Sequence, residues 1–310
     1  MSRELLFEIG VEELPAGYVS PALEQLASGV RAGLESLRLG HGGVITYGTP
    51  RRLAVLVHRV VERQSDFEEE AMGPASKVAV DAEGRPTRAL LGFCAGKGVE
   101  ASAVRRVETA KGEYVTVTVH HTGKPATEVL PAMLATVARE LQFPKSMRWD
   151  AGDYRFGRPV RWLLALFGGD IVPVAAFGLA AGRTTFGHRF LHPGTLEVRD
   201  PAAYLDALRA AHVVADQNER RRMVVEQVAA AAVERGGRVV ADDELTDIVN
   251  YLIEWPTAIP GGFGERYLDL PREVIVTALR EHQRFFAVEQ PDGALLPCFI
   301  TVRNGDARGV

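Results

Sequence analysis

Cysteine is almost absent from the sequence. Only Cys94 and Cys298 occur among 310 residues, and neither lies in a Cys-x-x-Cys pair or at ligand spacing from a histidine. Structural zinc sites and disulfide frameworks both require several such residues at short spacings. The sequence therefore indicates no metal site and no disulfide, and it favours a reducing compartment.

Long apolar runs are missing as well. No segment reaches the ~18 consecutive apolar residues that a membrane-spanning helix requires. Near the N-terminus, Glu4, Glu8, Glu12 and Glu13 interrupt the region where a signal peptide carries its apolar core. We therefore expect a cytoplasmic protein that has no contact with a membrane.

The sequence also lacks a nucleotide-binding signature. The stretch GFCAGKG at residues 92–98 lacks the spacing of a phosphate-binding loop and a preceding strand, so a turn that ends a helix is the better interpretation. His120 and His121 alternate on an expected strand and point to opposite faces. His188 and His192 have no third ligand nearby in the sequence. We expect neither ATP nor a metal ion to bind this chain.

The overall composition is that of a folded globular protein. Hydrophobic residues make up 46% and charged residues 25% of the chain, which is long enough for two domains. We place the two expected regions at 1–150 and 151–310. The formal net charge of -4 argues against a general polyanion binder, so any nucleic-acid surface must be a local basic face.

Hydrophobic periodicity predicts an α+β fold in which mixed or antiparallel sheets pack against helices. Asp200 before Pro201, and Asp216 with Glu219 three residues later, mark two helix starts. The expected strands are 4–10, 51–62, 113–122, 160–169, 171–182, 284–290 and 298–305. The expected helices are 21–37, 128–143, 217–235, 245–255 and 271–282, with another beginning at residue 201. The expected loops are the acidic run 65–70 and the Pro/Gly-rich run 256–264.

Basic residues gather with glycine and aromatic residues in a few short stretches, which makes them the candidate functional residues. Arginine pairs bidentately with phosphate, glycine allows close approach of the backbone, and aromatic rings stack on bases. The competing interpretation is that the same arginines clamp the fold by stacking on tryptophan or pairing with carboxylates. The candidates for binding a nucleic acid or another protein chain are Arg51, Arg52, Arg148, Arg155, Arg158, Arg161, Arg183, His188, Arg189, His282 and Arg284.

Both interpretations, phosphate binding and a structural clamp, apply to the stretch WDAGDYRFGRPVRW at residues 149–162. Proline at 159 fixes its own backbone and favours an extended Arg158, so we expect a corner that opens the strand VRWLLALF. Alternation on that strand places Trp162 on the core side and Arg161 on the other. We assign Arg161 to a clamp or interface, and Arg155 and Arg158 to RNA. We interpret Glu8, Glu12 and Glu13 as surface charge rather than as an acid/base pair.

Several of these stretches resemble one family, the bacterial glycyl-tRNA synthetase beta subunit, in its N-terminal half. They occur in the family's order over almost the whole chain. The matching stretches are LLFEIGVEELP (5–15), TPRRLA (49–54), KSMRW (145–149), RFGRPVRWLLAL (155–166), GRTTFGHRFLHPG (182–194), NYLIEWPTAIPGGF (250–263) and LPREVIVTALREHQRFFAV (270–288).

The resemblance implies a role in attaching glycine to tRNA(Gly). It implies a heterotetramer of two alpha and two beta chains, in which the alpha subunit forms glycyl-adenylate with ATP and magnesium and the beta subunit binds tRNA. Members of the family are about twice as long as this chain, and their HD-type and anticodon-binding domains would follow Val310.

The family's N-terminal portion is similar to the B3/B4 region of the phenylalanyl-tRNA synthetase beta chain, an α+β module with editing activity. A free-standing hydrolase that acts on mischarged tRNA is therefore the alternative function. Glycine is the smallest amino acid, so a pocket of its size excludes larger competitors and leaves little need for editing.

Overall fold

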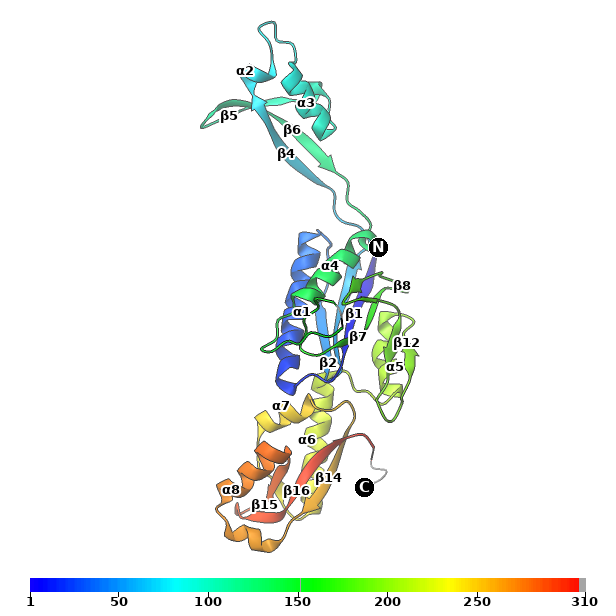
Figure 1. The fold of residues 1–310 in the computed structure, drawn as a ribbon, viewed down its shortest axis with the longest axis vertical. Coiled ribbons are helices and arrows are strands. Elements are labelled where there is room, and N and C mark those ends of the chain that lie inside the picture. The colour runs from blue at the N-terminus through cyan, green and yellow to red at the C-terminus, as the bar shows by residue number, and fades with distance from the viewer. Residues whose placement is uncertain (151, 307–310) are drawn as a thin grey trace. The chain divides into compact units, whose positions relative to one another are not determined.

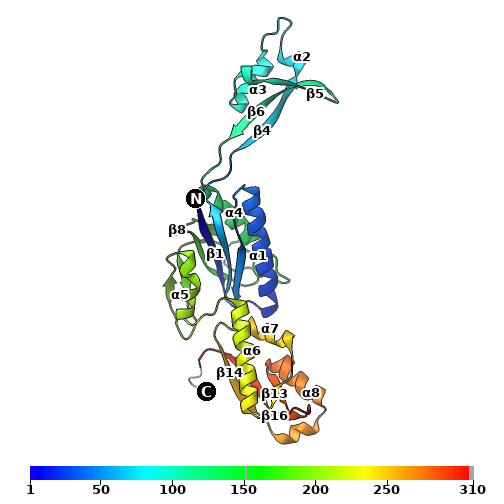
Figure 2. The same cartoon turned by 180° about the vertical axis from the view of Figure 1, so that it is seen from behind.

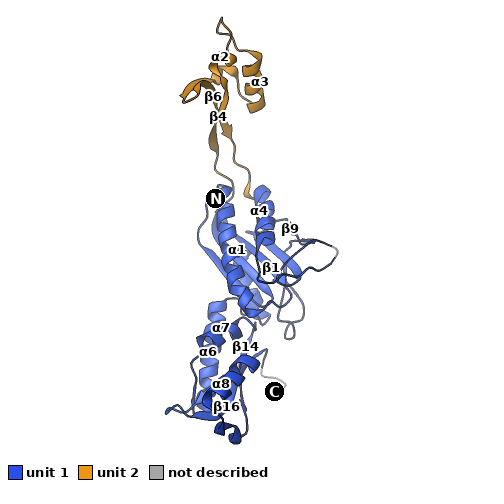
Figure 3. Ribbon diagram, turned by 60° about the vertical axis from the view of Figure 1, so that its left-hand side comes forward, with its two compact units in different colours: residues 1–62, 127–310 blue, residues 63–126 orange. Residues whose placement is uncertain are grey.

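The computed structural model describes residues 1–150 and 152–306, and it divides the chain into two compact units (Figure 3). One unit comprises residues 1–62 and 127–310, and the other comprises residues 63–126. The smaller unit is therefore an insertion within the larger one. Helices and antiparallel sheets confirm the expected α+β class. The expected boundary at residue 150 stays a prediction, since these units follow a different division.

A five-stranded antiparallel sheet forms the centre of the larger unit (Figure 1). Its first strand, β1, is buried from Leu5 to Val11 because both of its faces are covered. Helices α1 (Ala16–Ser36) and α4 (Ala126–Glu140) cover one face, and α5 (Tyr204–Ala210) contributes to the core on the other. The strand order is β2 (Val44–Thr49), β3 (Arg52–Val61), β1 (Ser2–Val11), β7 (Val160–Phe167) and β8 (Asp170–Ile171).

A four-stranded sheet forms the C-terminal part of the same unit (Figure 2). Helices α6 (Gln217–Glu234) and α7 (Asp243–Asn250) pack against it around Val224, Val249 and Ile300. Its strand order is β13 (Arg238–Val239), β15 (Phe286–Glu289), β16 (Leu295–Asn304) and β14 (Pro256–Gly262). The expected loop 256–264 is wrong, because β14 is an edge strand, where proline is tolerated without an N–H group.

The smaller unit is a three-stranded sheet covered by two helices. Helices α2 (Ser76–Ala79) and α3 (Arg88–Lys97) pack on strands β4 (Phe67–Ala75) and β6 (Gly112–His121), and β5 (Arg105–Thr109) pairs with β6 as the third strand. Gly98 ends α3 with a left-handed backbone (φ 68°), which confirms the expected helix-ending turn. The acidic run 65–70 is partly strand rather than loop, since Phe67 to Glu70 pair with β6.

The two helix starts marked by Asp200 and Asp216 are confirmed, whereas several expected extents are wrong; the expected helix 21–37, for example, already begins at Ala16. Asp200 caps the short helix Pro201–Ala203 through Ala203 N at 3.0 Å, and Asp216 caps α6. The expected helix 245–255 already ends at Asn250. The expected strand 171–182 is broken into β8, β9 (Ala175–Ala176) and β10 (Leu179–Ala180), and β9 is separated from β10 by a turn at Phe177 and Gly178, which both have positive φ. Among the described residues, no helix combines the length and apolarity needed to span a membrane.

Candidate nucleic-acid and subunit interface

Glu8 lies in the middle of the large sheet and is fully buried. Its carboxylate accepts hydrogen bonds from Trp162 Nε1, from the Tyr204 hydroxyl, and from Thr185 Oγ1 at 2.5 Å. Gly10 makes room for the indole, because a Cβ there would lie 1.9 Å from the Trp162 ring. The interpretation of Glu8 as surface charge is wrong, since its three partners come from segments more than 150 residues away.

Arg52 forms a second buried centre beside this one. Its guanidinium donates to Phe186 O at 2.9 Å and lies 3.2 Å from Glu254 Oε1, which also accepts from Thr49 Oγ1 at 2.8 Å. The Trp162 ring lies 5.9 Å from Arg52 Cζ, within the range of a cation–π contact. Arg51, with its guanidinium 5.7 Å from the same ring, donates to Gly187 O at 3.1 Å.

These contacts place Arg51 and Arg52 as internal clamps. The arginine–tryptophan clamp considered for the 149–162 stretch therefore exists, but it uses arginines from the TPRRLA stretch. Arg52 is fully enclosed and cannot contact RNA without rearrangement, so we leave it out of the proposed interface.

Arg220 joins the C-terminal sheet region to the large sheet. It is fully buried and donates to Asn250 O at 2.9 Å, Gly48 O at 2.7 Å and Val214 O at 2.5 Å. Burial lowers the pKa of Arg220 to about 10, an effect that Glu254 opposes. Sequence reasoning missed Arg220 and Glu254, because their partners lie in distant segments and no local motif identifies them.

The candidate residues of the stretch 183–189 also contact other groups of this chain. His188 is buried, with Nε2 2.9 Å from Asn304 Oδ1. Arg183 donates to two backbone carbonyls, those of Arg199 at 3.2 Å and Gly169 at 3.0 Å. Arg189 is half-exposed and pairs with Glu12 and with Glu13, the latter at 3.5 Å.

The segment before β7 presents exposed arginines on a loop with aromatic anchors. We call residues 145–150 and 152–158 the arginine loop. Met147 and Phe156 form a backbone bridge, so Arg148 and Arg155 are their immediate neighbours on adjoining strands of the loop. Ring contacts of 4.6–6.2 Å among Phe143, Trp149, Tyr154, Phe156 and Phe177 fix the loop to the body of the unit.

The arginines of this region differ in how they are paired. Arg155 is exposed and has no side-chain partner among residues 1–150 and 152–306. Among the same described residues, Arg158 donates only to the neighbouring Gly157 O at 3.0 Å. Arg148 lies 3.4 Å from the exposed Asp153, and Arg161 lies 4.0 Å from Glu12. Exposed pairs of this kind are weak, so these cations remain accessible to another molecule.

The expected corner and alternation in this region are confirmed. The chain bends at Gly157 and Arg158 and enters β7 at Val160. Trp162 is buried, whereas 62% of the Arg161 side chain is exposed. Arg161 near Glu12 matches the expected pairing with a carboxylate.

The last two candidates lie far along the chain from the arginine loop. His282 belongs to a π-helical turn, Ala278–Gln283, and is exposed. Arg284 follows with a left-handed backbone (φ 58°) and approaches Arg280 O at 3.3 Å and Glu281 at 3.5 Å. Among the described residues, no hydrogen bond or ion pair joins His282 or Arg284 to the arginine loop, so the eleven candidates do not form one site.

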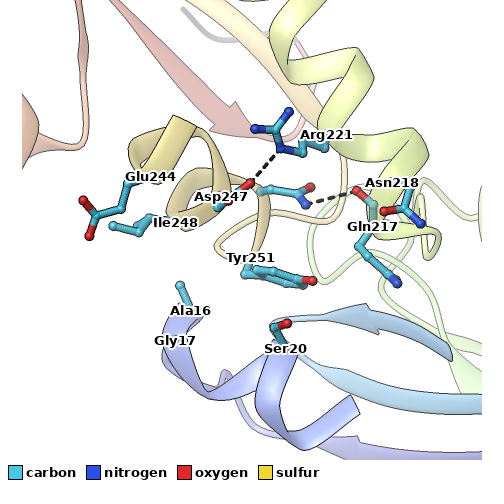
Figure 4. Close-up of a pocket in the computed structure, with 11 residues that line it drawn as sticks. Ala16, Gly17, Ser20, Gln217, Asn218, Arg221, Glu244, Asp247, Ile248 and Tyr251 are labelled. Atoms are coloured by element: carbon cyan, nitrogen blue, oxygen red, sulfur yellow. Dashed lines mark hydrogen bonds and ion pairs between the residues drawn. The ribbon is translucent and has the colours of Figure 1, made fainter. Parts of the chain in front are cut away.

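A cavity of about 310 Å³ lies between the start of α1 and helices α6 and α7 (Figure 4). Arg221 on its wall donates to Asp247 at 2.7 Å and to Asp243 at 2.8 Å. The Tyr251 ring lies across the space above Ser20, and burial raises the pKa of its hydroxyl. None of the candidates from the sequence lines this cavity. Within the described part of the chain, no three His, Cys, Asp or Glu residues are placed to hold a metal ion.

The comparisons with known proteins agree on one family. The family model described as glycyl-tRNA synthetase beta subunit matches residues 5–310. The chain belongs to this family. It is 46% identical over 307 residues to the glycine--tRNA ligase beta subunit of Moorella thermoacetica, which covers 99% of this chain and 44% of the relative.

Two further relatives in the glycyl-tRNA synthetase beta subunit family show the same pattern. The beta subunit of Myxococcus xanthus is 44% identical over 308 residues, with 99% of this chain and 44% of the relative covered. The beta subunit of Bacillus subtilis is 42% identical over 309 residues, with 99% of this chain and 45% of the relative covered. The chain thus spans less than half the length of these curated relatives.

Proposed function

We propose that this chain supports the attachment of glycine to tRNA(Gly) as the N-terminal part of a glycine--tRNA ligase beta subunit, by binding tRNA and by docking on a partner subunit. The names of its curated relatives, glycine--tRNA ligase beta subunits, support the reaction. Family membership over nearly the whole chain supports the place of this part in the subunit.

The observation that carries the RNA role is the arginine loop. Arg155 is exposed and unpaired among the described residues, Arg158 contacts only a neighbouring carbonyl, and aromatic packing fixes the backbone that bears them. A guanidinium held in this way can donate two parallel hydrogen bonds to a phosphate. Because the supporting loop is already ordered by packing, binding loses less conformational entropy than it would from a flexible segment.

The proposed division of labour between the subunits is supported by the absence of a nucleotide-binding signature from the sequence. In the proposal, an alpha subunit binds ATP and magnesium and activates glycine, and two alpha and two beta subunits form the enzyme. Arg161 and Arg189 lie with Glu12 on one exposed surface next to the arginine loop, and we assign this surface to subunit docking. Action in the cytoplasm also remains a prediction.

The alternative function, a free-standing hydrolase that acts on mischarged tRNA, is not supported by the relatives and is not proposed. The buried Glu8 carboxylate is enclosed by three donors from the chain itself. An enclosed carboxylate of this kind has no room for the water and ester that hydrolysis requires.

The test is a pull-down of this chain with the alpha subunit, followed by a glycylation assay. We expect the tagged chain to retain the alpha subunit, and to compete with the full-length beta subunit and so lower glycylation by the mixture. The double variant Arg161→Ala and Arg189→Ala should retain less alpha subunit than the control variant Arg222→Ala. If the chain retains neither alpha subunit nor tRNA(Gly), the proposed function is refuted.

A further inference from the structure

A buried hydrogen-bond acceptor on the wall of the cavity in Figure 4 has no donor within the described chain. Asn250, the last residue of α7, lines this cavity and is only 3% exposed. Its side-chain nitrogen donates to Gln217 O at 3.0 Å, which fixes the orientation of the amide, because a carbonyl oxygen can only accept. The amide oxygen, Oδ1, is left without a partner among residues 1–150 and 152–306. Since buried polar atoms are almost always hydrogen-bonded, Oδ1 marks a place for a donor.

The charge at the α7 wall of the cavity is predominantly negative. Among the described residues, the ion pairs linked to α7 join five carboxylates, those of Asp242, Asp243, Glu244, Asp247 and Glu281, to three guanidinium groups, those of Arg221, Arg280 and Arg284. Glu244 and Asp247 line the cavity itself, and Arg221 is the one basic residue among its described lining residues. An excess of carboxylates attracts a cation and repels phosphate.

The cavity also has the size and the aromatic wall that suit a single side chain. Its volume of about 310 Å³ is at the lower end of the range of about 300–1,000 Å³ for small-molecule sites. The Tyr251 ring lies across the space above Ser20, and the face of an aromatic ring attracts cations. A guanidinium group is planar, stacks on aromatic rings and carries several N–H donors. It therefore matches the Asn250 oxygen, the Asp247 carboxylate and the Tyr251 ring together.

We propose that this cavity receives an arginine side chain of a partner subunit. Arginine is enriched among the few interface residues that supply most of the binding energy, and these residues enter pockets of the other chain. RNA is the less suitable occupant, because a base brings phosphates that the carboxylates repel. The inference rests on the proposed function in one respect, which is that the partner is the alpha subunit. The docking surface of Arg161, Arg189 and Glu12 is separate, since none of these residues lines the cavity.

The first test titrates the 310-residue chain with N-acetyl-arginine methylamide and follows the side-chain amide signal of Asn250 by NMR. We expect a saturable shift of this signal. The matching citrulline compound has nearly the same shape but no charge, so it should bind about tenfold more weakly or worse. Absence of a saturable shift with the arginine compound, or equal binding of the two compounds, would overturn the inference.

A pair of charge variants tests the cavity wall. Asp247→Asn removes a carboxylate that lines the cavity and leaves Arg221 its second partner, Asp243. We expect it to weaken the binding of the arginine compound and of the alpha subunit about fivefold or more. Asp243→Asn is the matched control, because it removes the other ion pair of Arg221 from the same helix but lies outside the cavity lining. Its affinities should be those of the unchanged chain.

A second pair of variants fills the cavity without disturbing the core. Ala16, Gly17 and Ser20 of α1 all line the cavity, and a Cβ at Gly17 would meet nothing within 4 Å. Gly17→Leu should therefore keep the melting temperature of the chain or raise it, while the arginine compound and the alpha subunit bind more weakly. Gly96→Leu is the control, since Gly96 is likewise exposed, helical and open at its Cβ but lies on α3.

The outcomes separate this inference from the proposed function. Unchanged alpha-subunit affinity in both Asp247→Asn and Gly17→Leu would overturn the inference and leave the proposed function intact. A loss of tRNA(Gly) affinity with normal retention of the alpha subunit would also overturn it, because the cavity would then bind RNA. If the unchanged chain retains no alpha subunit, the proposed docking fails, and saturable binding of the arginine compound that depends on Asp247 would still support an arginine site for another protein partner.

Discussion

Replacement of Glu8 by alanine should be among the most damaging single changes in the chain. The substitution removes the acceptor for the Trp162 indole N–H and for the hydroxyls of Thr185 and Tyr204. A buried donor without an acceptor costs roughly 1–3 kcal/mol, so the three together cost about 3–9 kcal/mol before any cavity is counted. Since domains are stable by only about 5–15 kcal/mol, we expect Glu8→Ala to leave little folded protein.

A graded series makes this prediction measurable. Glu8→Gln keeps one acceptor oxygen, and the Tyr204 hydroxyl can rotate to accept from the new amide, so we expect a loss of about 1–3 kcal/mol. Glu13→Ala is the control, because it removes an exposed carboxylate 3.5 Å from Arg189 and should cost less than about 1 kcal/mol.

The assay is urea unfolding followed by circular dichroism and by tryptophan fluorescence, for which Trp162 is a reporter beside the substitution. If Glu8→Ala unfolds within about 1 kcal/mol of the unchanged chain, the three donors find other partners and our account of the sheet centre is wrong.

Three further predictions concern catalysis, cysteine and pH. The purified chain should not catalyse glycine-dependent pyrophosphate exchange, because it has no phosphate-binding loop; detectable exchange would contradict this. Cys94 and Cys298 are both buried and unbridged, so replacement of both by alanine should preserve the fold at a modest cost in stability, and the loss of a stoichiometric metal on replacement would refute their assignment. A hydrogen bond from Arg272 lowers the pKa of Glu289 below its ordinary 4.5. The unfolded chain therefore binds more protons near that pH, and the stability from this pair is present above pH 4.5 and is lost as the pH falls through the lowered value. Arg272→Ala should make the acid unfolding profile shallower in that range, and an unchanged profile would refute the pairing.

Elements with strong local signals could be predicted from the sequence. The alternation of residues 113–121, the Asp216 cap of α6 and the glycine stop after α3 all depend on neighbours in the chain, and each is present in the structure. The strand β14 could not be predicted, because its prolines and glycines indicate a loop. It forms a strand through its pairing with β16, some 40 residues later in the chain.

In the candidate site, too, features that depend on neighbours in the chain could be predicted, and features that depend on distant segments could not. Burial of Trp162 and exposure of Arg161 follow from alternation on a strand and are confirmed. The role of Glu8 was not predictable, because a carboxylate between apolar residues looks like an exposed position until Trp162, Thr185 and Tyr204 are brought to it by the fold. For the same reason, the sequence could not show that Arg52 is buried beside Glu254 whereas Arg155 is exposed.

The most direct test of the central claim is the salt dependence of tRNA(Gly) binding by the assembled enzyme that carries Arg155→Ala and Arg158→Ala in its beta subunit. If the arginine loop contacts phosphates, affinity falls and the slope becomes shallower by up to about two contacts. The control pair Arg222→Ala and Arg235→Ala, at exposed positions on and just after α6, should leave the slope unchanged. Normal folding with an unchanged slope in the arginine-loop variant would contradict the claim that this loop binds RNA.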